Sequence, residues 1–364
     1  MGDRLTVELG ARSYPIVVGR GLLDDSRHFV PHLAGKQVCI VTNDTVAALY
    51  LDRLRATLKG LVVDACVLPD GEQHKTLATY ERVVDHLMAH RHGRQTTVVA
   101  LGGGVVGDIA GFAAATYQRG VAFIQVPTTL LAQVDSSVGG KTGVNHPTGK
   151  NMIGAFHQPR CVVIDTQTLA TLPAREYRAG LAEVVKYGVI RDRTFFEWLE
   201  RNVGALLARE AEPLVHVIRT SCSIKASVVG ADERESGERA ILNFGHTFGH
   251  ALETTAGFGA LLHGEAVAIG MVMAADLSAA LGRVTHADAL RIKRLIERLG
   301  LPVRAAIAVD AAAIADAMAM DKKAVAGNIR LVLVEAIGKV SLVDDVPRDL
   351  VVRTVQKDDR LCHG

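Results

Sequence analysis

The chain has 364 residues, of which 49% are hydrophobic, and it therefore exceeds the size of one typical hydrophobic core. We expect two domains, with the active site in a cleft of the kind that two domains commonly form. The formal net charge is only +2, from 41 basic and 39 acidic residues, which excludes a broad cationic field for nucleic acid or a membrane surface. The composition therefore predicts a small-molecule partner.

The cysteines and the chain start indicate a reducing, internal environment. Five cysteines are scattered through the sequence without a CxxC pair, so neither a disulfide framework nor a thiolate zinc site is indicated. The first residues, MGDRLTVELG, carry acidic side chains and strand-like alternation instead of a signal-peptide core. The most apolar helical stretch, residues 265–281, contains Glu265 and Asp276 and is not an uninterrupted membrane span. We expect a soluble, cytoplasmic protein.

Short β-branched runs alternate with helical patterns in the first half of the chain, which predicts parallel βαβ units and a sheet covered by helices. The clearest strands are expected at residues 37–44, 61–70, 96–104, 121–129 and 161–169. After the segment LPAREY, residues 172–177, the pattern changes to long helical stretches, apart from a late strand candidate at 330–343. We predict an α/β nucleotide-binding domain with a parallel, Rossmann-like sheet over residues 1–174, followed by a mainly α-helical metal- and substrate-binding domain over residues 175–364.

A strand that runs into a glycine turn indicates a phosphate-binding loop in the first domain. Gly102, Gly103 and Gly104 let the backbone turn after the strand. Gly107 can keep the following helix close to the sheet, so that the helix N-terminus faces a pyrophosphate. The pattern GGGxxGD matches GxGxxG only loosely, and a tight strand–helix turn without a ligand is the alternative.

A second turn, Asp70–Leu77, strengthens the nucleotide interpretation because it also follows a predicted strand. It carries Glu72 and Lys75, whose side chains suit ribose hydroxyls and phosphates. The alternative interpretation is an ordinary solvated turn.

Residues 127–151 are expected to form one long irregular segment that is rich in hydrogen-bonding groups and flexible at its glycines. The polar residues that it supplies are Thr128, Thr129, Asp135, Ser136, Lys141, Lys150 and Asn151. Ordered loops of this composition are usually functional. The lysines and hydroxyls indicate a phosphorylated, polyhydroxylated substrate beside the nucleotide. The alternative is a mobile surface loop whose lysines serve solubility.

Three histidines indicate a metal site in the second domain. His246 and His250 are one helical turn apart, and His263 follows after a glycine-broken loop. Catalytic zinc commonly takes three nitrogen or carboxylate ligands and keeps one position open. Spacing alone nominates His246 and His250 as the pair, and it leaves the acid open among three candidates: Glu183, Glu253 and Glu265. The alternative for each histidine is a helix-capping or core role.

Motifs in family order make the chain resemble 3-dehydroquinate synthase. They are DGEQHKTL, GGGVVGD, the long run Gly111–Asn151, GLAEVVKYG, RAILNFGHTFGHALE, LHGEAVAIG and a late DKK, between residues 70 and 323. The resemblance implies conversion of 3-deoxy-D-arabino-heptulosonate 7-phosphate to 3-dehydroquinate and phosphate, a step of the shikimate pathway. It implies transient oxidation by NAD, phosphate elimination, re-reduction and aldol closure. It also implies a divalent metal, which is usually zinc, with cobalt as the alternative. A homodimer is implied as well.

The resemblance also implies site residues, matched position by position. Glu183, His246 and His263 become the metal ligands, which gives His250 an indirect or proton-handling role. The implied NAD contacts are Asp70, Gly71, Glu72, Gln73, His74, Lys75, Gly104, Val105, Val106, Gly107, Asp108, Thr128, Thr129, Lys141, Lys150, Thr168, Leu169, Ala170 and Thr171. The implied substrate-site residues are Arg119 from the partner subunit, Asp135, Lys141, Lys150, Asn151, Lys186, Lys225, Arg239, Asn243, His250, Lys322 and Lys323.

Three alternatives remain. Related sugar-phosphate cyclases share cofactor and metal but take substrates without a carboxylate, and the combination of Lys225, Arg239, Asn243 and His250 favours the dehydroquinate reaction. Polyol dehydrogenases of similar architecture would release NADH and would not need so many cations for phosphate and carboxylate. A nucleotide-sensing protein would not need an open Lewis-acid site.

Overall fold

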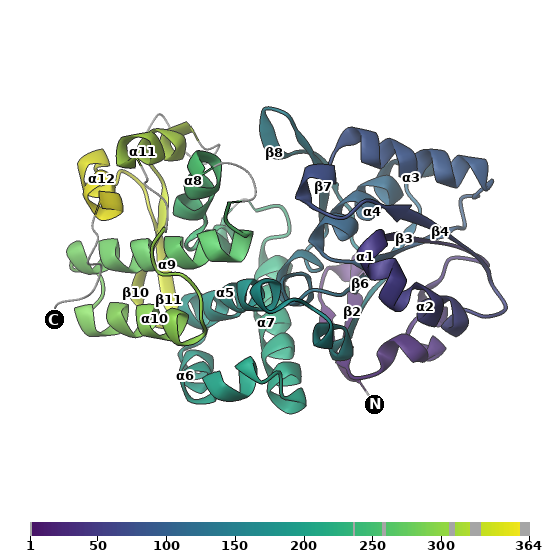
Figure 1. Ribbon diagram of the computed structural model, residues 1–364, viewed down its shortest axis with the longest axis horizontal. Coiled ribbons are helices and arrows are strands. Elements are labelled where there is room, and N and C mark those ends of the chain that lie inside the picture. The colour runs from purple at the N-terminus through teal and green to yellow at the C-terminus, as the bar shows by residue number, and fades with distance from the viewer. Residues whose placement is uncertain (1, 236, 257–259, 306–309, 321–328, 357–364) are drawn as a thin grey trace. The chain divides into compact units, whose positions relative to one another are not determined.

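The computed structural model describes residues 2–235, 237–256, 260–305, 310–320 and 329–356 (Figure 1). Its internal contacts divide the chain into two compact units. The first unit comprises Met1–Leu172 and Leu214–Arg234, and the second comprises Pro173–Pro213 and Glu235–Gly364. The second unit therefore begins next to the boundary that we predicted, but one later segment belongs to the first unit.

The first unit is built on a seven-stranded sheet with the order β1-β2-β9-β6-β5-β3-β4. Its strands are β1 (Asp3–Val7), β2 (Tyr14–Gly19), β3 (Gln37–Asn43), β4 (Val62–Leu68), β5 (Thr97–Gly102), β6 (Ala122–Pro127) and β9 (Cys161–Asp165). The β1–β2 pair is antiparallel, and all other pairs in this sheet are parallel. The predicted α/β unit with a mainly parallel sheet is confirmed.

Helices cover both faces of this sheet (Figure 1). Cys39 and Val41 of β3 pack in the cluster that contains α3 (Leu77–Ala89) and α4 (Gly104–Thr116). The alternate residues Val38 and Ile40 pack in the opposite cluster, with the short helices α1 (Asp44–Val46) and α2 (Asp52–Thr57) and the π-helical turn between them. Burial on both faces explains why these strands read as continuous apolar runs.

The strand order reverses at β3, whose two neighbours are β4 and β5. In open α/β sheets, ligands bind outside the carboxyl ends of the strands at such a reversal. Asn43 ends β3 at this point, and Gly102 ends β5 directly before the glycine turn. The topology therefore puts the predicted nucleotide turn at the place where such sheets bind their ligands.

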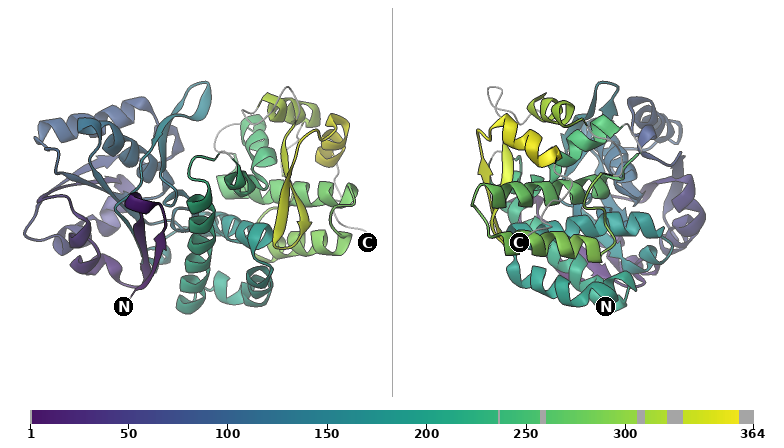
Figure 2. Two further views of the ribbon diagram at one scale, coloured as in Figure 1. Left: turned by 180° about the vertical axis from the view of Figure 1, so that it is seen from behind. Right: turned by 60° about the vertical axis from the view of Figure 1, so that its left-hand side comes forward.

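The expectation of one irregular segment over residues 127–151 is wrong. The segment contains a π-helical turn (Ala132–Ser136) and enters an antiparallel hairpin of β7 (Lys141–His146) and β8 (Gly149–Phe156). Figures 1 and 2 show this hairpin extending from the first unit. A Cβ at Gly154 would lie 2.1 Å from the carbonyl oxygen of Thr142, so glycine here permits close approach of two strands.

Helix α7 (Ala211–Ala231) lies beyond the predicted boundary in sequence, yet most of it belongs to the first unit. Its Lys225 ammonium donates to the carboxylate and to the carbonyl of Asp135, each at 2.7 Å. The Cys222 thiol donates to the carbonyl of Gln133 at 3.2 Å. These contacts join segments far apart in the chain, so no local sequence pattern predicts them.

The second unit is mainly helical, as predicted. Its helices are α5 (Ala174–Arg191), α6 (Arg193–Leu207), α8 (His246–Ala256), α9 (His263–Ala280), α10 (His286–Arg298), α11 (Ala311–Met320) and α12 (Arg348–Gln356). The late strand candidate forms a hairpin of β10 (Leu331–Ala336) and β11 (Lys339–Val343). Helix α9 is buried along most of its length and contacts α5, α8, α10 and β10, as Figures 1 and 2 show. Three of these elements carry the predicted metal ligands.

Two further expectations concern thiols and membranes. Cys39, Cys66, Cys161 and Cys222 are buried free thiols, and Cys362 lies outside the described residues. Within the described parts of the chain, no helix combines the length and hydropathy needed to cross a bilayer.

Candidate metal centre and nucleotide-binding turns

The second unit brings the three predicted metal ligands together from three helices. Glu183 lies on α5, His246 begins α8 and His263 begins α9. The Nε2 atoms of His246 and His263 lie 3.4 Å and 3.9 Å from Oε1 of Glu183. One ligand atom from each residue falls within 4.8 Å of the others, so one cation can reach all three. We call these three residues the Glu183 cluster.

The Glu183 carboxylate is fully buried, and no hydrogen bond within the described residues reaches its Oε1 atom. Lys186, one helical turn further along α5, forms an ion pair with Oε2. A buried carboxylate without hydrogen bonds is costly in free energy, and such groups usually pair with a cation or coordinate a metal. The two imidazoles beside Glu183 make a divalent metal the group that fits this arrangement.

The histidines of this cluster are oriented through their other ring nitrogens. Nδ1 of His246 lies 3.1 Å from the carbonyl oxygen of Phe244, and Nδ1 of His263 lies 3.5 Å from Oε2 of Glu253. Such contacts fix the tautomer that leaves Nε2 as the metal ligand. Burial, and then the nearby Lys186 and the other histidines, hold the pKa of His246 well below its usual value, which favours the neutral ligand form.

The hydrogen-bond partners of Glu183, Glu253 and Glu265 distinguish these three candidates for the carboxylate ligand of the metal. Arg175 donates to both oxygens of Glu265 at 2.7 Å, and the backbone N–H of Leu262 donates to one of them at 2.9 Å. Glu253 faces Nδ1 of His263, so its carboxylate suits an orienting role. Glu183 is the acid whose oxygens best fit a metal.

His250 lies close to the same cluster. Its ring centroid is 5.6 Å from that of His246 and 5.9 Å from that of His263. His250, Glu253 and His263 also form a combination that could hold a cation. The choice of Glu183, His246 and His263 as ligands therefore stays a prediction, supported by the buried Glu183 oxygens.

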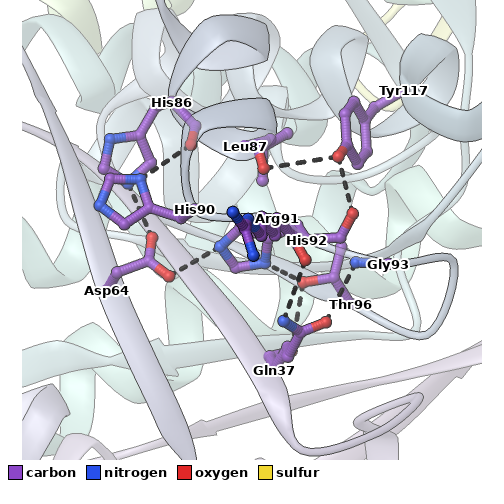
Figure 3. A network of polar contacts seen from close by, with 10 residues as sticks. All are labelled: Gln37, Asp64, His86, Leu87, His90, Arg91, His92, Gly93, Thr96 and Tyr117. Carbon is purple, nitrogen blue, oxygen red and sulfur yellow. Dashed lines mark hydrogen bonds and ion pairs between the residues drawn. The ribbon is translucent and has the colours of Figure 1, made fainter.

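A third combination of possible ligands, Cys39, Asp64 and His86, lies in the first unit. Figure 3 shows Asp64 between two histidines. Nε2 of His86 lies 2.7 Å from Oδ1 and Nε2 of His92 lies 2.7 Å from Oδ2, so each carboxylate oxygen has a partner. Burial raises the pKa of the Cys39 thiol and disfavours the thiolate that a metal requires. We call Asp64, His86 and His92 the Asp64 cluster and interpret it as a structural brace that joins β4 to α3 and to the segment after α3.

The predicted phosphate turn has the expected form. Strand β5 ends at Gly102, and α4 begins at Gly104 without a side-chain cap on its first turn. A Cβ at Gly107 would lie 2.7 Å from Oε1 of Gln125 on β6, so this glycine lets the helix pack tightly against the sheet. The backbone N–H groups at the start of α4 suit a phosphate.

The second predicted turn, Asp70–Lys75, lies beside the first. Lys75 is buried, and its Nζ lies 2.5 Å from Oδ2 of Asp108 on α4 and 2.6 Å from Oδ1 of Asn151 on β8. Burial opposes the charge, but the Asp108 carboxylate raises the pKa of Lys75 and keeps its ammonium protonated. Two predicted cofactor segments and one predicted substrate residue thus meet at Lys75.

The Asp70 carboxylate has two partners that we did not predict from the sequence. Asn43 donates to Oδ1 at 2.6 Å, and Thr45 donates to Oδ2 at 2.9 Å. Asn43 is the polar residue at the end of a predicted strand, and this position is a signal that could have identified it. Thr45 has no comparable signal.

The predicted threonines fall into two groups. The Thr128 N–H donates to the carbonyl of Gly102 at 3.0 Å, while its buried hydroxyl has no hydrogen-bond partner in the described parts of the chain and is available to a ligand. The hydroxyls of Thr168 and Thr171 make internal contacts, with Gln133 at 3.0 Å and with Tyr50 at 2.5 Å. If the Thr168–Thr171 segment contacts NAD, we expect its backbone or Leu169 and Ala170 to do so.

The predicted substrate residues lie in both units. Arg239 is buried at 2% exposure, and Asn243 donates to Glu235 at 2.8 Å. Gln118 and Arg119 both have positive φ, 53° and 66°, a strained arrangement that often marks functional segments. The remaining members are Asp135 beside Lys225, Lys141 on β7, Lys150 and Asn151 on β8, and Lys186 on α5. Lys322 and Lys323 lie outside the described residues.

Solved structures of similar fold bind a nucleotide and a metal. A 2-deoxy-scyllo-inosose synthase complexed with carbaglucose-6-phosphate, NAD+ and Co2+ aligns with a TM-score of 0.89 and 27% identity, over 97% of this chain and 99% of that chain. A 2-epi-5-epi-valiolone synthase from Streptomyces hygroscopicus with NAD+ and Zn2+ bound aligns with a TM-score of 0.88 and 32% identity, over 96% of each chain.

Sequence comparison identifies the family more specifically than the similarity of fold does. A protein of Azotobacter vinelandii, described as a 3-dehydroquinate synthase, is 58% identical over 98% of this chain and 97% of its own length. Residues 65–179 match the family model described as 3-dehydroquinate synthase N-terminal, and residues 180–324 match the one described as 3-dehydroquinate synthase C-terminal. With both models matched in order, this chain belongs to the 3-dehydroquinate synthase family.

Proposed function

We propose that this chain converts 3-deoxy-D-arabino-heptulosonate 7-phosphate to 3-dehydroquinate and inorganic phosphate, a step of the shikimate pathway in aromatic amino acid biosynthesis. Family membership supports this activity, because the match to the relatives covers nearly the whole length of both chains. The observation that carries the proposal is the buried Glu183 carboxylate, whose Oε1 has two histidines beside it and accepts no hydrogen bond within the described residues. That arrangement fits a divalent metal, which the proposed reaction requires.

Glu183, His246 and His263 would hold the divalent ion, zinc or cobalt, and the glycine turn with Asp70–Lys75 would hold NAD. When bound, the metal supplies a Lewis acid for a substrate oxygen, and NAD supplies a hydride acceptor that returns the hydride later in the cycle. The roles left to the chain are binding, orientation and proton handling. They fall on the cationic and polar residues around these two sites.

The substrate is a sugar acid with a carboxylate and a phosphate, so several cations must bind its two anionic ends. Within the part of the chain that the structure describes, the candidates for this role are Lys141, Lys150, Lys186, Lys225 and Arg239. Asp135 holds the Lys225 ammonium at 2.7 Å and can fix its direction. His250 lies beside the proposed metal ligands, where it can pass on the proton of the substrate hydroxyl that is oxidised.

The finer features of the proposal concern assembly and location. We propose a cytoplasmic homodimer in which Arg119 serves the site of the partner subunit. The strained backbone at Gln118 and Arg119 supports a functional role for this segment. The buried free thiols of the described cysteines fit a reducing compartment.

The test is phosphate release by the metal-loaded protein with NAD and 3-deoxy-D-arabino-heptulosonate 7-phosphate, while NADH absorbance is followed in the same sample. We expect steady phosphate release without lasting NADH, because the hydride returns within each cycle. Accumulating NADH would indicate a dehydrogenase instead. Turnover of hexose 6-phosphates in place of the sugar acid would indicate a cyclase for carboxylate-free substrates.

A further inference from the structure

The β7–β8 hairpin contains a bulge at the residues that we expect to contact the ligands. Val144 pairs with Ile153 and His146 pairs with Gly149, so Asn145 alone faces Lys150, Asn151 and Met152. Asn151 has a φ of 55°, which is uncommon for a residue other than glycine. A bulge with a strained residue needs contacts from outside the regular ladder to hold its shape.

Asn145 makes these contacts. Its Oδ1 accepts the backbone N–H of Asn151 at 2.8 Å, which replaces the hydrogen bond that a regular ladder would supply. Its Nδ2 donates to Oε1 of Glu72 at 2.8 Å, and its backbone N–H donates to the carbonyl of Lys75 at 2.8 Å. A single residue therefore ties the bulge to the Asp70–Lys75 turn.

The Asn151 side chain is held from the other direction. Lys75 donates from Nζ to Oδ1 of Asn151 at 2.6 Å, and the same ammonium is paired with Asp108 of α4. Asn151 is thus fixed at its backbone by Asn145 and at its side chain by Lys75. Asn145 is only partly buried and is not needed to fill a hydrophobic core.

We propose that Asn145 is a positioning residue, which holds the bulge so that Lys150 and Asn151 face the ligands of the nucleotide turn in a productive orientation. The proposal rests on the proposed function, because Lys150 and Asn151 are assigned to the substrate and NAD there. Asn145 acts through these neighbours, and its loss leaves the Glu183 cluster unchanged.

The first test compares Asn145→Ala with Thr148→Ala. Thr148 lies in the exposed turn of the same hairpin, where its hydroxyl contacts Nδ1 of His146 at 2.7 Å. We expect Asn145→Ala to lower kcat/KM roughly 10- to 100-fold, because misplaced ligand-binding groups cost about this much. Metal content and thermal midpoint should stay close to those of the wild type, and Thr148→Ala should be near wild type in every measurement.

Amide hydrogen exchange gives a readout that does not depend on activity. In Asn145→Ala the Asn151 N–H loses its acceptor, so a peptide covering residues 149–153 should exchange faster, while Thr148→Ala should leave the Asn151 amide protected. If Asn145→Ala matches Thr148→Ala in kcat/KM, or if exchange rises without a kinetic effect, the positioning role is wrong. If the wild type releases no phosphate, the proposed function fails, and exchange still decides whether Asn145 holds the bulge.

A rescue experiment tests the link to Glu72 specifically. Asn145→Asp keeps an acceptor for the Asn151 N–H but sets a carboxylate against Glu72, and it should reduce kcat/KM. Adding Glu72→Gln supplies an amide donor to the new carboxylate, so activity should recover several-fold in the Asn145→Asp background. The same Glu72→Gln change should give no recovery with Asn145→Ala. Equal effects in the two backgrounds would contradict the proposed link.

Discussion

Each unit of this chain holds a carboxylate between two histidines, and the two clusters differ in how the carboxylate is hydrogen-bonded. In the Asp64 cluster both oxygens have imidazole partners at 2.7 Å, so the charge is satisfied inside the protein (Figure 3). In the Glu183 cluster the carboxylate is more deeply buried, Lys186 pairs with Oε2, and within the described residues Oε1 accepts no hydrogen bond. The same residue types therefore give a brace in one case and a candidate metal site in the other.

The second difference lies in the distance between the Nε2 atom of each histidine and the carboxylate. In the Glu183 cluster the Nδ1 atoms face the Phe244 carbonyl and Glu253, which leaves Nε2 directed toward the shared carboxylate as a ligand. These Nε2 atoms lie 3.4 Å and 3.9 Å from Oε1 of Glu183, whereas in the Asp64 cluster each Nε2 lies 2.7 Å from an Asp64 oxygen and forms a hydrogen bond. Counting histidines and acids near one another does not separate the two cases, but the hydrogen-bond partners do.

The largest expected effect comes from Glu183→Gln. The amide cannot replace a carboxylate ligand, so we expect loss of the metal and a fall in turnover of about 10³-fold or more, because several kcal/mol of Lewis-acid stabilisation is lost. Metal content by mass spectrometry and the rate of phosphate release measure this. Asp64→Asn is the matched control, and this variant should keep the metal bound at the Glu183 cluster. A Glu183→Gln protein with full metal content would remove the ligand assignment.

Glu253→Gln should have a smaller effect on the same site. The Glu253 carboxylate orients His263 through a 3.5 Å contact with Nδ1, and loss of such an orienting group typically lowers metal affinity or activity 10- to 100-fold. A competition titration with a chelator measures the affinity. Unchanged affinity would mean that Glu253 does not orient His263.

Asp64→Asn should affect stability and not metal binding. It weakens two hydrogen bonds to a charged group, which we expect to lower the free energy of unfolding by roughly 1–3 kcal/mol. Urea unfolding measures the change, and Asp85→Asn, at an exposed position on α3, is the control. A loss of metal in Asp64→Asn would reverse our assignment of the two clusters.

The smallest expected effect is the acid sensitivity of the Asp64 cluster. Burial raises the pKa of Asp64, but the hydrogen bonds from His92 and His86 lower it from 3.8 to about 2. Since the folded-state pKa is the lower one, the ionised carboxylate stabilises the fold above pH 3.8, and this contribution disappears as the pH falls through about 2. The side chain is partly exposed, so the contribution is about 1 kcal/mol at most. Comparing wild type with Asp64→Asn between pH 4 and pH 2 should show it, and parallel curves would contradict it.

The sequence predicts features whose signals are local. The β5 strand, the glycine turn and α4 follow one another directly, and the helical spacing of His246 and His250 is correct. The hairpin within residues 141–156 was missed because glycine is also typical of flexible loops. At Gly143 and Gly154 it instead lets two strands approach closely.

Features that depend on contacts between distant residues could not be predicted from spacing. The choice among Glu183, Glu253 and Glu265 required the partners of each carboxylate. The place of α7 in the first unit required its contacts with Gln133 and Asp135. The Asp64 cluster was missed because His86 and His92 are 22 and 28 residues away from Asp64.

Anomalous diffraction from zinc-soaked crystals, measured on both sides of the zinc absorption edge, tests the difference between the two clusters most directly. We predict a peak about 2.0–2.2 Å from an oxygen of Glu183 and from Nε2 of His246 and His263, the usual distances for zinc with these ligands. We predict no peak within bonding distance of Asp64. A peak at Asp64, His86 and Cys39, or an empty Glu183 cluster in zinc-saturated crystals, would contradict the account.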